Sequence, residues 1–152
     1  MSAIFWIISG IILITLYFLY AGVIMKKNKV KEASAGIDVQ LKKRYDLIPN
    51  LLNMAAKFMA HESKLMEEIT KLRTAAMANS FKDNPQEKIK NEKLLESKLK
   101  EFNLSVENYP DLKSNQTMMT AMQSMNEVEE HIAAARRFYN AAVNDLTNEI
   151  GR

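Results

Sequence analysis

The chain has 152 residues, of which 47% are hydrophobic, and its formal net charge at pH 7 is +3. Four lysines in one short stretch account for this charge, so the remainder is near neutral, which argues against a phosphate-binding surface and a nucleic-acid partner. The chain contains no cysteine, which excludes a disulfide, a thiolate metal site and a cysteine nucleophile.

Residues 3–25 carry no charged side chain and read AIFWIISGIILITLYFLYAGVIM. A bilayer core of about 30 Å needs about 20 apolar residues in a helix, so this segment predicts a transmembrane anchor. A cleaved signal peptide is the alternative, but its basic start, shorter apolar core and small-residue cleavage site are not convincing here. We expect residues 1–27 to form a single-pass anchor and residues 28–152 to form one domain.

All 21 lysine and arginine residues follow the apolar segment. Because positive residues are retained in the cytoplasm, their position predicts a cytoplasmic C-terminal domain and an N-terminus outside. Four lysines come directly after the segment and are expected to face anionic lipid headgroups. These are Lys26, Lys27, Lys29 and Lys31.

Beyond the anchor, scarce glycine and proline and the absence of period-two alternation predict an all-α domain. A first long helix is expected from Ile37 to about residue 80, because apolar side chains recur there at 3-4 spacing. Pro49 lies inside this stripe, and we expect it to kink or split the helix. The stripe consists of Ile37, Leu41, Tyr45, Ile48, Leu52, Ala55, Met59, Met66, Ile69 and Ala76.

Asn84, Pro85 and Glu87 give the start signal of a second helix: an N-cap, a proline at the first helical position and an acid at the third. Its predicted apolar face consists of Ile89, Leu95, Leu99, Phe102 and Val106. Pro110 ends this helix, and a third is expected from about Asn115. Short connections favour antiparallel neighbours, so we predict an antiparallel bundle of three long helices, or four if Pro49 breaks the first.

The third helix carries the methionine cluster Met118, Met119, Met122 and Met125 within the longer stripe. A methionine cluster is able to serve as an adaptable binding face, but its helical spacing favours packing in the core. The rest of this stripe consists of Ile132, Tyr139, Val143, Leu146 and Ile150.

The sequence contains only two histidines, His61 and His131. "HESK" at residues 61–64 is not the zinc motif HExxH, and Glu127 precedes His131 by four positions where a di-metal bundle needs three. A metal site of His61, Glu62 and His131 is the alternative to ordinary surface side chains. Serine-nucleophile and phosphate-loop motifs are absent, so we expect no enzyme, no cofactor and no small-molecule substrate.

Charged residues interrupt the apolar stripes. Arg44 lies between Leu41 and Ile48 at helical spacing, and Arg136 follows Ile132 by one turn. Buried charges persist only when they are paired, which predicts an interhelical polar layer that fixes helix register. The alternative is that long side chains cover apolar surface and keep their charged ends in water. Expected partners are Asp38, Asp46, Glu62, Arg73, Arg137 and Asn140.

Four blocks in collinear order, IDVQLKKRYDLIPNLL, AHES, YPDLKSN and AAARRFYNAAVNDLTNEI, resemble the LemA family of bacterial membrane-anchored proteins. The resemblance covers roughly Ala33 to Ile150 and implies an N-terminal transmembrane helix followed by an antiparallel helical bundle. Similar proteins have no established enzymatic activity; some are associated with magnetosome membranes, and others are encoded beside membrane metalloproteases. The family supplies no catalytic residues.

The family's strong positions map onto Ile37, Asp38, Gln40, Arg44, Asp46, Leu47, Ile48, Pro49, Asn50, Tyr109, Pro110, Leu112, Arg136, Tyr139 and Asn140. On this basis Gln40 and Asn50 join the predicted polar layer. Members often carry an aromatic residue where this chain has "EASAG", and often continue past the last helix. The first departure puts a contact near the membrane in doubt, and the second removes a tail.

These observations predict a non-enzymatic scaffold or adaptor in a bacterial cell membrane, which acts through protein contacts or self-association. The expected partners are membrane lipid and either further copies of the chain or another membrane protein. One alternative is a membrane-shaping homo-oligomer, with anchors and lysines on one bilayer and bundles side by side. The other is a metal-dependent hydrolase that uses His61, Glu62 and His131.

Overall fold

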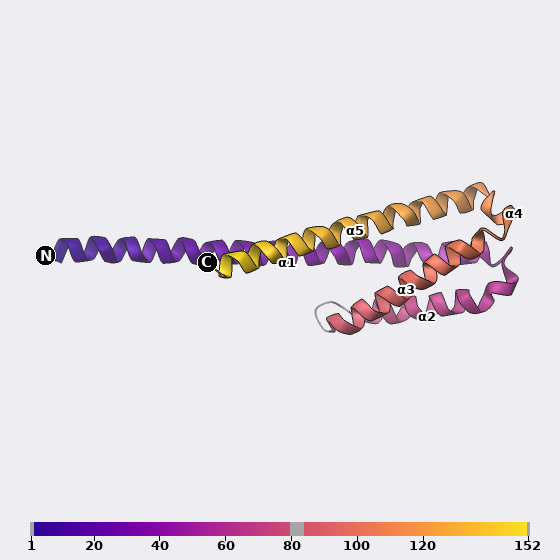
Figure 1. Ribbon diagram of the computed structural model, residues 1–152, viewed down its shortest axis with the longest axis horizontal. Helices are drawn as coiled ribbons and strands as arrows, with labels where there is room; N and C mark the ends of the chain where they lie inside the picture. Colours follow the sequence, from indigo (N-terminus) through magenta and orange to yellow (C-terminus); the bar gives the residue numbers. More distant parts are fainter. Residues whose placement is uncertain (1, 80–83, 152) are drawn as a thin grey trace. The chain divides into compact units, whose positions relative to one another are not determined.

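The computed structural model describes residues 2–79 and 84–151, and the elements in this part of the chain are all helical (Figure 1). The predicted all-α class is therefore confirmed. In chain order the elements are α1 (Ser2–Ala55), the 3-10 turn η1 (Ala60–Glu62), α2 (Ser63–Ala78), α3 (Pro85–Val106), α4 (Pro110–Lys113) and α5 (Gln116–Ile150). They form two compact units: the described parts of residues 1–37 and 133–152, and those of residues 38–132.

Helix α1 contains the whole of the predicted apolar segment, residues 3–25, and continues without interruption to Ala55. The end of the apolar segment is therefore not a helix boundary. Its most apolar 18-residue window has a mean hydropathy of 2.3, and none of this window is buried inside the protein. By length and composition the helix is able to cross a bilayer. Its large exposed side chains include Phe5, Trp6, Ile11, Leu13, Tyr17 and Phe18.

The expectation that Pro49 splits the first helix is wrong. Helix α1 runs through Pro49 and ends at Ala55, so the predicted single helix to about residue 80 is interrupted later, by a turn and η1. Proline has no N–H to donate to the carbonyl four residues earlier, which here belongs to Tyr45. Arg73 of α2 supplies the missing donor, with its Nε 2.7 Å from that oxygen. This replacement explains how the helix accommodates the proline.

The other two prolines both begin helices, which was the prediction for Pro85, whereas Pro110 was expected only to end the preceding helix. Pro85 is the first residue of α3, and the side chain of Asn84 accepts a hydrogen bond from the backbone N–H of Glu87 at 3.2 Å. Pro110 begins the single turn of α4. Asn115 then starts α5, because its Oδ1 accepts hydrogen bonds from the backbone N–H groups of the second and third helical residues at 3.0 and 3.1 Å.

In the unit of residues 38–132, α2 and α3 lie side by side and antiparallel (Figure 1). Lys98 forms an ion pair with Glu68 at 2.9 Å, and Lys88 donates a hydrogen bond to the carbonyl of Ala76 at 2.6 Å. Ile89 departs from the predicted apolar face of α3, because it is 44% exposed. The core consists mainly of Leu41, Ile48, Leu51, Met59, Ile69, Leu95, Phe102, Leu112, Met118, Met125 and Ile132.

In the unit of residues 1–37 and 133–152, α1 and α5 pair in antiparallel fashion. Lys26 of α1 lies 2.5 Å from Glu149 of α5, and Lys29 lies 3.5 Å from Asp145. The interface between the two helices buries Ala33, Ile37 and Ala142. Two of the four lysines expected to face lipid headgroups are thus paired with acids of α5.

Candidate functional site: a buried polar layer

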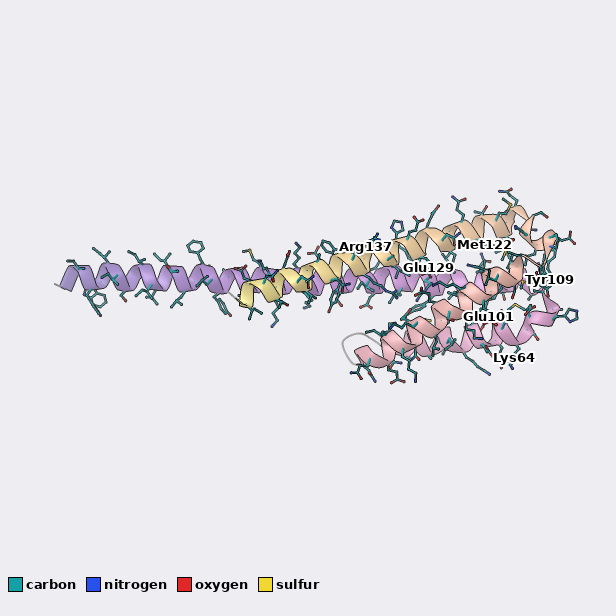
Figure 2. The ribbon with its side chains drawn as sticks, in the orientation of Figure 1. Lys64, Glu101, Tyr109, Met122, Glu129 and Arg137 are labelled. Atoms are coloured by element: carbon teal, nitrogen blue, oxygen red, sulfur yellow. The ribbon has the colours of Figure 1, made fainter. Side chains whose placement is uncertain are left out.

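Five polar side chains meet in the core of the unit of residues 38–132, and we call this group the polar layer. Helix α1 contributes Arg44 and Tyr45, α3 contributes Lys88 and Glu92, and α5 contributes Glu129, which is labelled in Figure 2. Arg44, Lys88 and Glu92 are 0%, 4% and 1% exposed. Charged side chains are almost never buried to this extent unless they are paired.

Arg44 is the cation that joins the three helices. One terminal nitrogen donates to both carboxylate oxygens of Glu129, at 2.9 and 3.2 Å, and the other donates to Oε2 of Glu92. Burial by itself lowers the pKa of Arg44, but the neighbouring charges of Glu129 and Glu92 more than offset this effect and the pKa is raised. The guanidinium therefore stays charged inside the core.

Lys88 and Tyr45 complete the layer around the second oxygen of Glu92. The Tyr45 hydroxyl donates to Oε1 of Glu92, and Lys88 donates to the Tyr45 oxygen at 2.6 Å and lies 3.2 Å from the same carboxylate. Burial, together with the hydrogen bond to Glu92, raises the pKa of Tyr45, so its phenol stays protonated. The carbonyl of Ala76, which Lys88 also binds, lies in the last turn of α2 and has no intrahelical donor there.

The layer is balanced in charge, with two cations and two anions. Buried ion pairs offset the free energy of desolvation only where geometry is good and the remaining donors and acceptors are satisfied. Here Arg44, Glu92 and Lys88 each bind at least two partners. Together with Arg73 on α2, the layer connects four helices.

One edge of the layer keeps unused hydrogen-bonding capacity. The Nε of Arg44 and the Oε1 of Gln40, one turn apart on α1, are buried without a hydrogen-bond partner. A donor and an acceptor at this spacing suit a shared water molecule. Asp38 lies near the same edge, and its pKa is raised. Burial is the main cause; the charge of Lys88 opposes the shift, and the charge of Glu92 adds to it.

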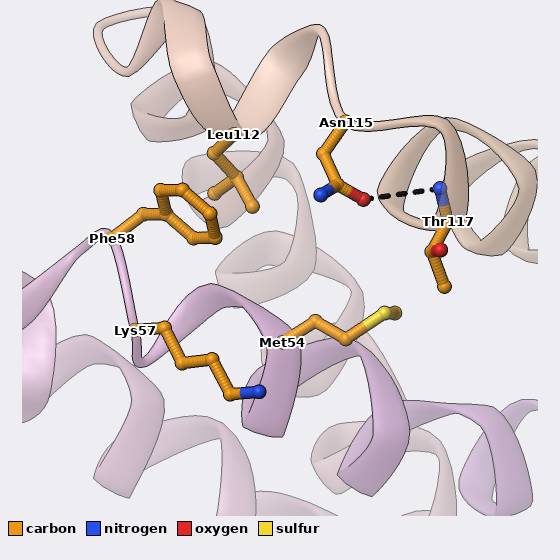
Figure 3. A pocket seen from close by; sticks show the side chains of 6 residues that line it. All are labelled: Met54, Lys57, Phe58, Leu112, Asn115 and Thr117. Atoms are coloured by element: carbon orange, nitrogen blue, oxygen red, sulfur yellow. Dashed lines mark hydrogen bonds between the residues drawn. The ribbon is translucent and has the colours of Figure 1, made fainter.

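A cleft of about 280 Å³ lies in the same unit, where the end of α1 meets α4 and the start of α5 (Figure 3). Figure 3 shows the Phe58 ring beside Leu112, which is fully buried, while Phe58 itself is 40% exposed. Among the residues that the structure describes, no acidic side chain lines the cleft, and Lys57 contributes a positive charge. Its walls are formed by Met54, Lys57, Phe58, Leu112, Asn115 and Thr117.

Residues 33–152 match the model of the LemA family. The chain belongs to the LemA family. A comparison with curated proteins found none that matches. The match includes the whole polar layer and the cleft but begins after the apolar segment, so the capacity of this LemA-family chain to cross a membrane rests on its own length and composition.

Arg44 lies in a buried polar group, with partners that differ from those expected. Arg44 is buried and paired, so the alternative of a water-facing head is wrong for this residue. Its partners are Glu92 and Glu129, neither of which was predicted. Arg73 enters through its bond to a backbone carbonyl rather than to a carboxylate.

Most of the other predicted members lie elsewhere. Asp46, Asn50, Arg137 and Asn140 are exposed, and Figure 2 labels Arg137 on α5. Gln40, Glu62 and Arg136 are partly exposed, and Glu62 accepts a hydrogen bond from Tyr109 at 3.4 Å. Gln40 reaches the edge of the polar layer through its buried Oε1, whereas the four exposed side chains lie outside the buried contacts of Arg44.

The register of α3 contained a signal for the missing partner. Its buried positions run backward from Val106 through residues 102, 99 and 95, and the same 4-3 spacing continues to Glu92 and Lys88. Both residues are charged, so the spacing of apolar side chains alone points to Ile89, which is exposed. Glu129 lies beside buried Val128 and offers no comparable signal.

The alternative metal site does not assemble in the part of the chain that the structure describes. Within residues 2–79 and 84–151, no group of three or more His, Cys, Asp or Glu side chains is placed to hold a metal ion. His61 and His131 are both exposed. The structure therefore does not bring His61, Glu62 and His131 together in such a group.

Proposed function

We propose that this LemA-family protein is a non-enzymatic adaptor that the first part of α1 holds in a bacterial cell membrane. The supporting observation is the dual composition of one helix. Helix α1 carries an exposed apolar window able to cross a bilayer and, farther along, contributes Arg44 and Tyr45 to a buried polar layer. The helix that anchors the protein is therefore also part of its folded core.

The state of the ionisable groups supports a structural role for the layer. Arg44, Lys88 and Glu92 are at most 4% exposed, and their charges are used in bonds to one another, to Tyr45 and to Glu129. A general acid or base must come within hydrogen-bond reach of a substrate, which these buried groups do not offer. The layer therefore holds helices in register instead of performing chemistry.

The cleft at Phe58 supplies the protein contact. Exposed Phe58 and partly exposed Met54 offer an apolar surface, and Lys57 favours an anionic neighbour. The partner that fits is a polypeptide segment with an apolar side chain next to a carboxylate. The four lysines after the apolar segment favour a cytoplasmic position for this cleft.

Affinity recovery of the full-length protein in lipid-preserving polymer particles tests the proposal. Phe58→Ser and Lys57→Glu change the cleft, while Lys42→Glu, at an exposed position of α1 outside the cleft, is the control for a charge reversal. We expect a partner that the wild type and the control retain and that both cleft variants lose, with thermal stability unchanged. Recovery that is equal for all four proteins contradicts the proposal, and co-recovery of a second copy alone favours self-association.

A further inference from the structure

The last turn of α5 lies beside α1 at the point where the apolar segment ends. Oε2 of Glu149 is 2.5 Å from Nζ of Lys26, which also donates to the carbonyl of Asp145 at 3.4 Å. The other Glu149 oxygen reaches farther back along α1, because a Cβ added to Gly22 would lie 3.6 Å from it. The Glu149 carboxylate thus lies between the levels of Gly22 and Lys26.

This level corresponds to the surface of a bilayer that α1 crosses. Residues 3–25 span roughly 35 Å at about 1.5 Å per residue, whereas the hydrocarbon core is about 30 Å thick. About three residues of the segment therefore extend into the headgroup region. Tyr20 and Lys26 flank this region, which agrees with the preference of aromatic and cationic side chains for the interface.

The chemistry of the last turn of α5 suits that environment. Ile150 is 66% exposed, so a large apolar side chain projects from the helix without cover from the protein. Beside it, the charge of Glu149 is compensated by Lys26, which lowers the free-energy cost of bringing a carboxylate to the membrane. Lys27 and Lys31, one turn apart and exposed on α1, are left to contact anionic headgroups.

We infer that the end of α5 is a second membrane contact, in which Ile150 inserts into the lipid interface beside α1 and the Lys26–Glu149 pair fixes its depth. This inference rests on the proposed anchoring of α1. The last turn of α5 lies beside the end of the apolar segment of that helix, and the occupant is the lipid interface. Both helices of this unit then meet the bilayer, one through it and one at its surface.

Because the chain has no cysteine, single-cysteine probes test the inference cleanly. Ile150→Cys and the control Asn140→Cys carry an environment-sensitive fluorophore in the full-length protein, in vesicles of equal parts phosphatidylcholine and phosphatidylglycerol. Asn140 is exposed on the same helix, and about 14 Å of helix separates it from Glu149. We expect blue-shifted emission at position 150 and several-fold stronger quenching by headgroup-labelled lipid than at position 140.

Equal quenching at the two positions would overturn the inference. Quenching of the single tryptophan, Trp6, by lipids brominated in the acyl chain reports the anchoring of α1 independently. If Trp6 is not quenched, the proposed anchoring itself fails. If Trp6 is quenched and position 150 resembles position 140, only the second membrane contact is wrong.

Charge exchange tests the part assigned to the ion pair. Glu149→Lys places two cations together at Lys26 and is expected to reduce lipid quenching at position 150 to the level of position 140. The double change Lys26→Glu with Glu149→Lys restores an opposite-charge pair and should restore the quenching. Quenching that Glu149→Lys leaves unchanged would show that the pair does not set the depth of α5.

Discussion

Arg73 donates a hydrogen bond from its Nε to the carbonyl oxygen of Tyr45 at 2.7 Å, across the interface between α2 and α1. That carbonyl is the one that Pro49 leaves without an intrahelical donor. A residue on a different helix therefore satisfies the backbone where proline breaks the hydrogen-bond pattern. The neighbouring side chain of Tyr45 belongs to the polar layer, so the bond also joins α2 to that layer.

A double-mutant cycle measures this relationship. Arg73→Ala leaves the Tyr45 carbonyl without its partner and is expected to lower the free energy of unfolding by about 1–3 kcal/mol. In a Pro49→Ala background the backbone N–H of residue 49 is available, so the same change should cost clearly less. Denaturant unfolding of the four proteins checks this. Equal costs in both backgrounds would contradict the replacement of the missing donor by Arg73.

Removal of Arg44 should have a larger effect. Arg44→Met leaves Glu92 buried and short of a cation, and breaking a buried pair in this way costs about 3–5 kcal/mol of the free energy of unfolding. Lys43→Met, an exposed neighbour on the same helix, is expected to change stability by less than about 0.5 kcal/mol. Chemical denaturation compares the two. A similar small loss in both variants would show that the pair contributes little.

Replacement of both charges distinguishes stability from register. Arg44→Met combined with Glu92→Leu removes the buried charges together, and such replacements often recover much of the lost stability. We expect the double variant to be more stable than Arg44→Met alone, as measured by the denaturation midpoint. If the double variant is the less stable of the two, the layer is worth more than the apolar packing that replaces it.

The raised pKa of the Tyr45 phenol predicts that the protein loses stability in alkaline solution. Its pKa in the folded protein is raised above the value of 10.0 for an unfolded chain, so the stabilisation is complete below pH 10 and decreases as the pH rises above 10. Tyr45→Phe lacks this titration. The difference in free energy of unfolding between wild type and variant should therefore shrink as the pH rises above 10. A difference that is constant over this range contradicts the assignment.

The cap of α3 is a local test of the fold. Asn84→Ala removes the acceptor for the Glu87 backbone N–H and should lower the free energy of unfolding by about 1 kcal/mol. Asn126→Ala, at an exposed position within α5, removes no cap and is the control. Thermal unfolding that responds equally to both substitutions would argue against the cap.

The features predictable from the sequence depend on neighbours along the chain. The start signal of α3 lies within four residues, in Asn84, Pro85 and Glu87. The uncharged run of residues 3–25 predicts a membrane-spanning helix by its length alone. Pro49 gives an equally local signal, but its outcome depends on Arg73, 24 positions later, on another helix. A local rule for proline therefore failed where a tertiary contact replaced the lost bond.

The site was predictable only in part for the same reason. The spacing around Arg44 identified a charge at an inward position, but its partners Glu92 and Glu129 are 48 and 85 positions away. Residue type alone does not distinguish a charged residue at an inward position of α3 from one on a solvent-facing helix surface. Only the extension of the buried register from Leu95 back to Glu92 distinguishes the two.

The mass of the full-length protein in lipid-preserving particles tests the adaptor proposal most directly. We predict particles that contain a second polypeptide in a fixed ratio, and we predict that Phe58→Ser reduces them to the chain alone while α1 stays in the lipid. A wild-type protein that is present as the chain alone, with no other polypeptide, would contradict the account.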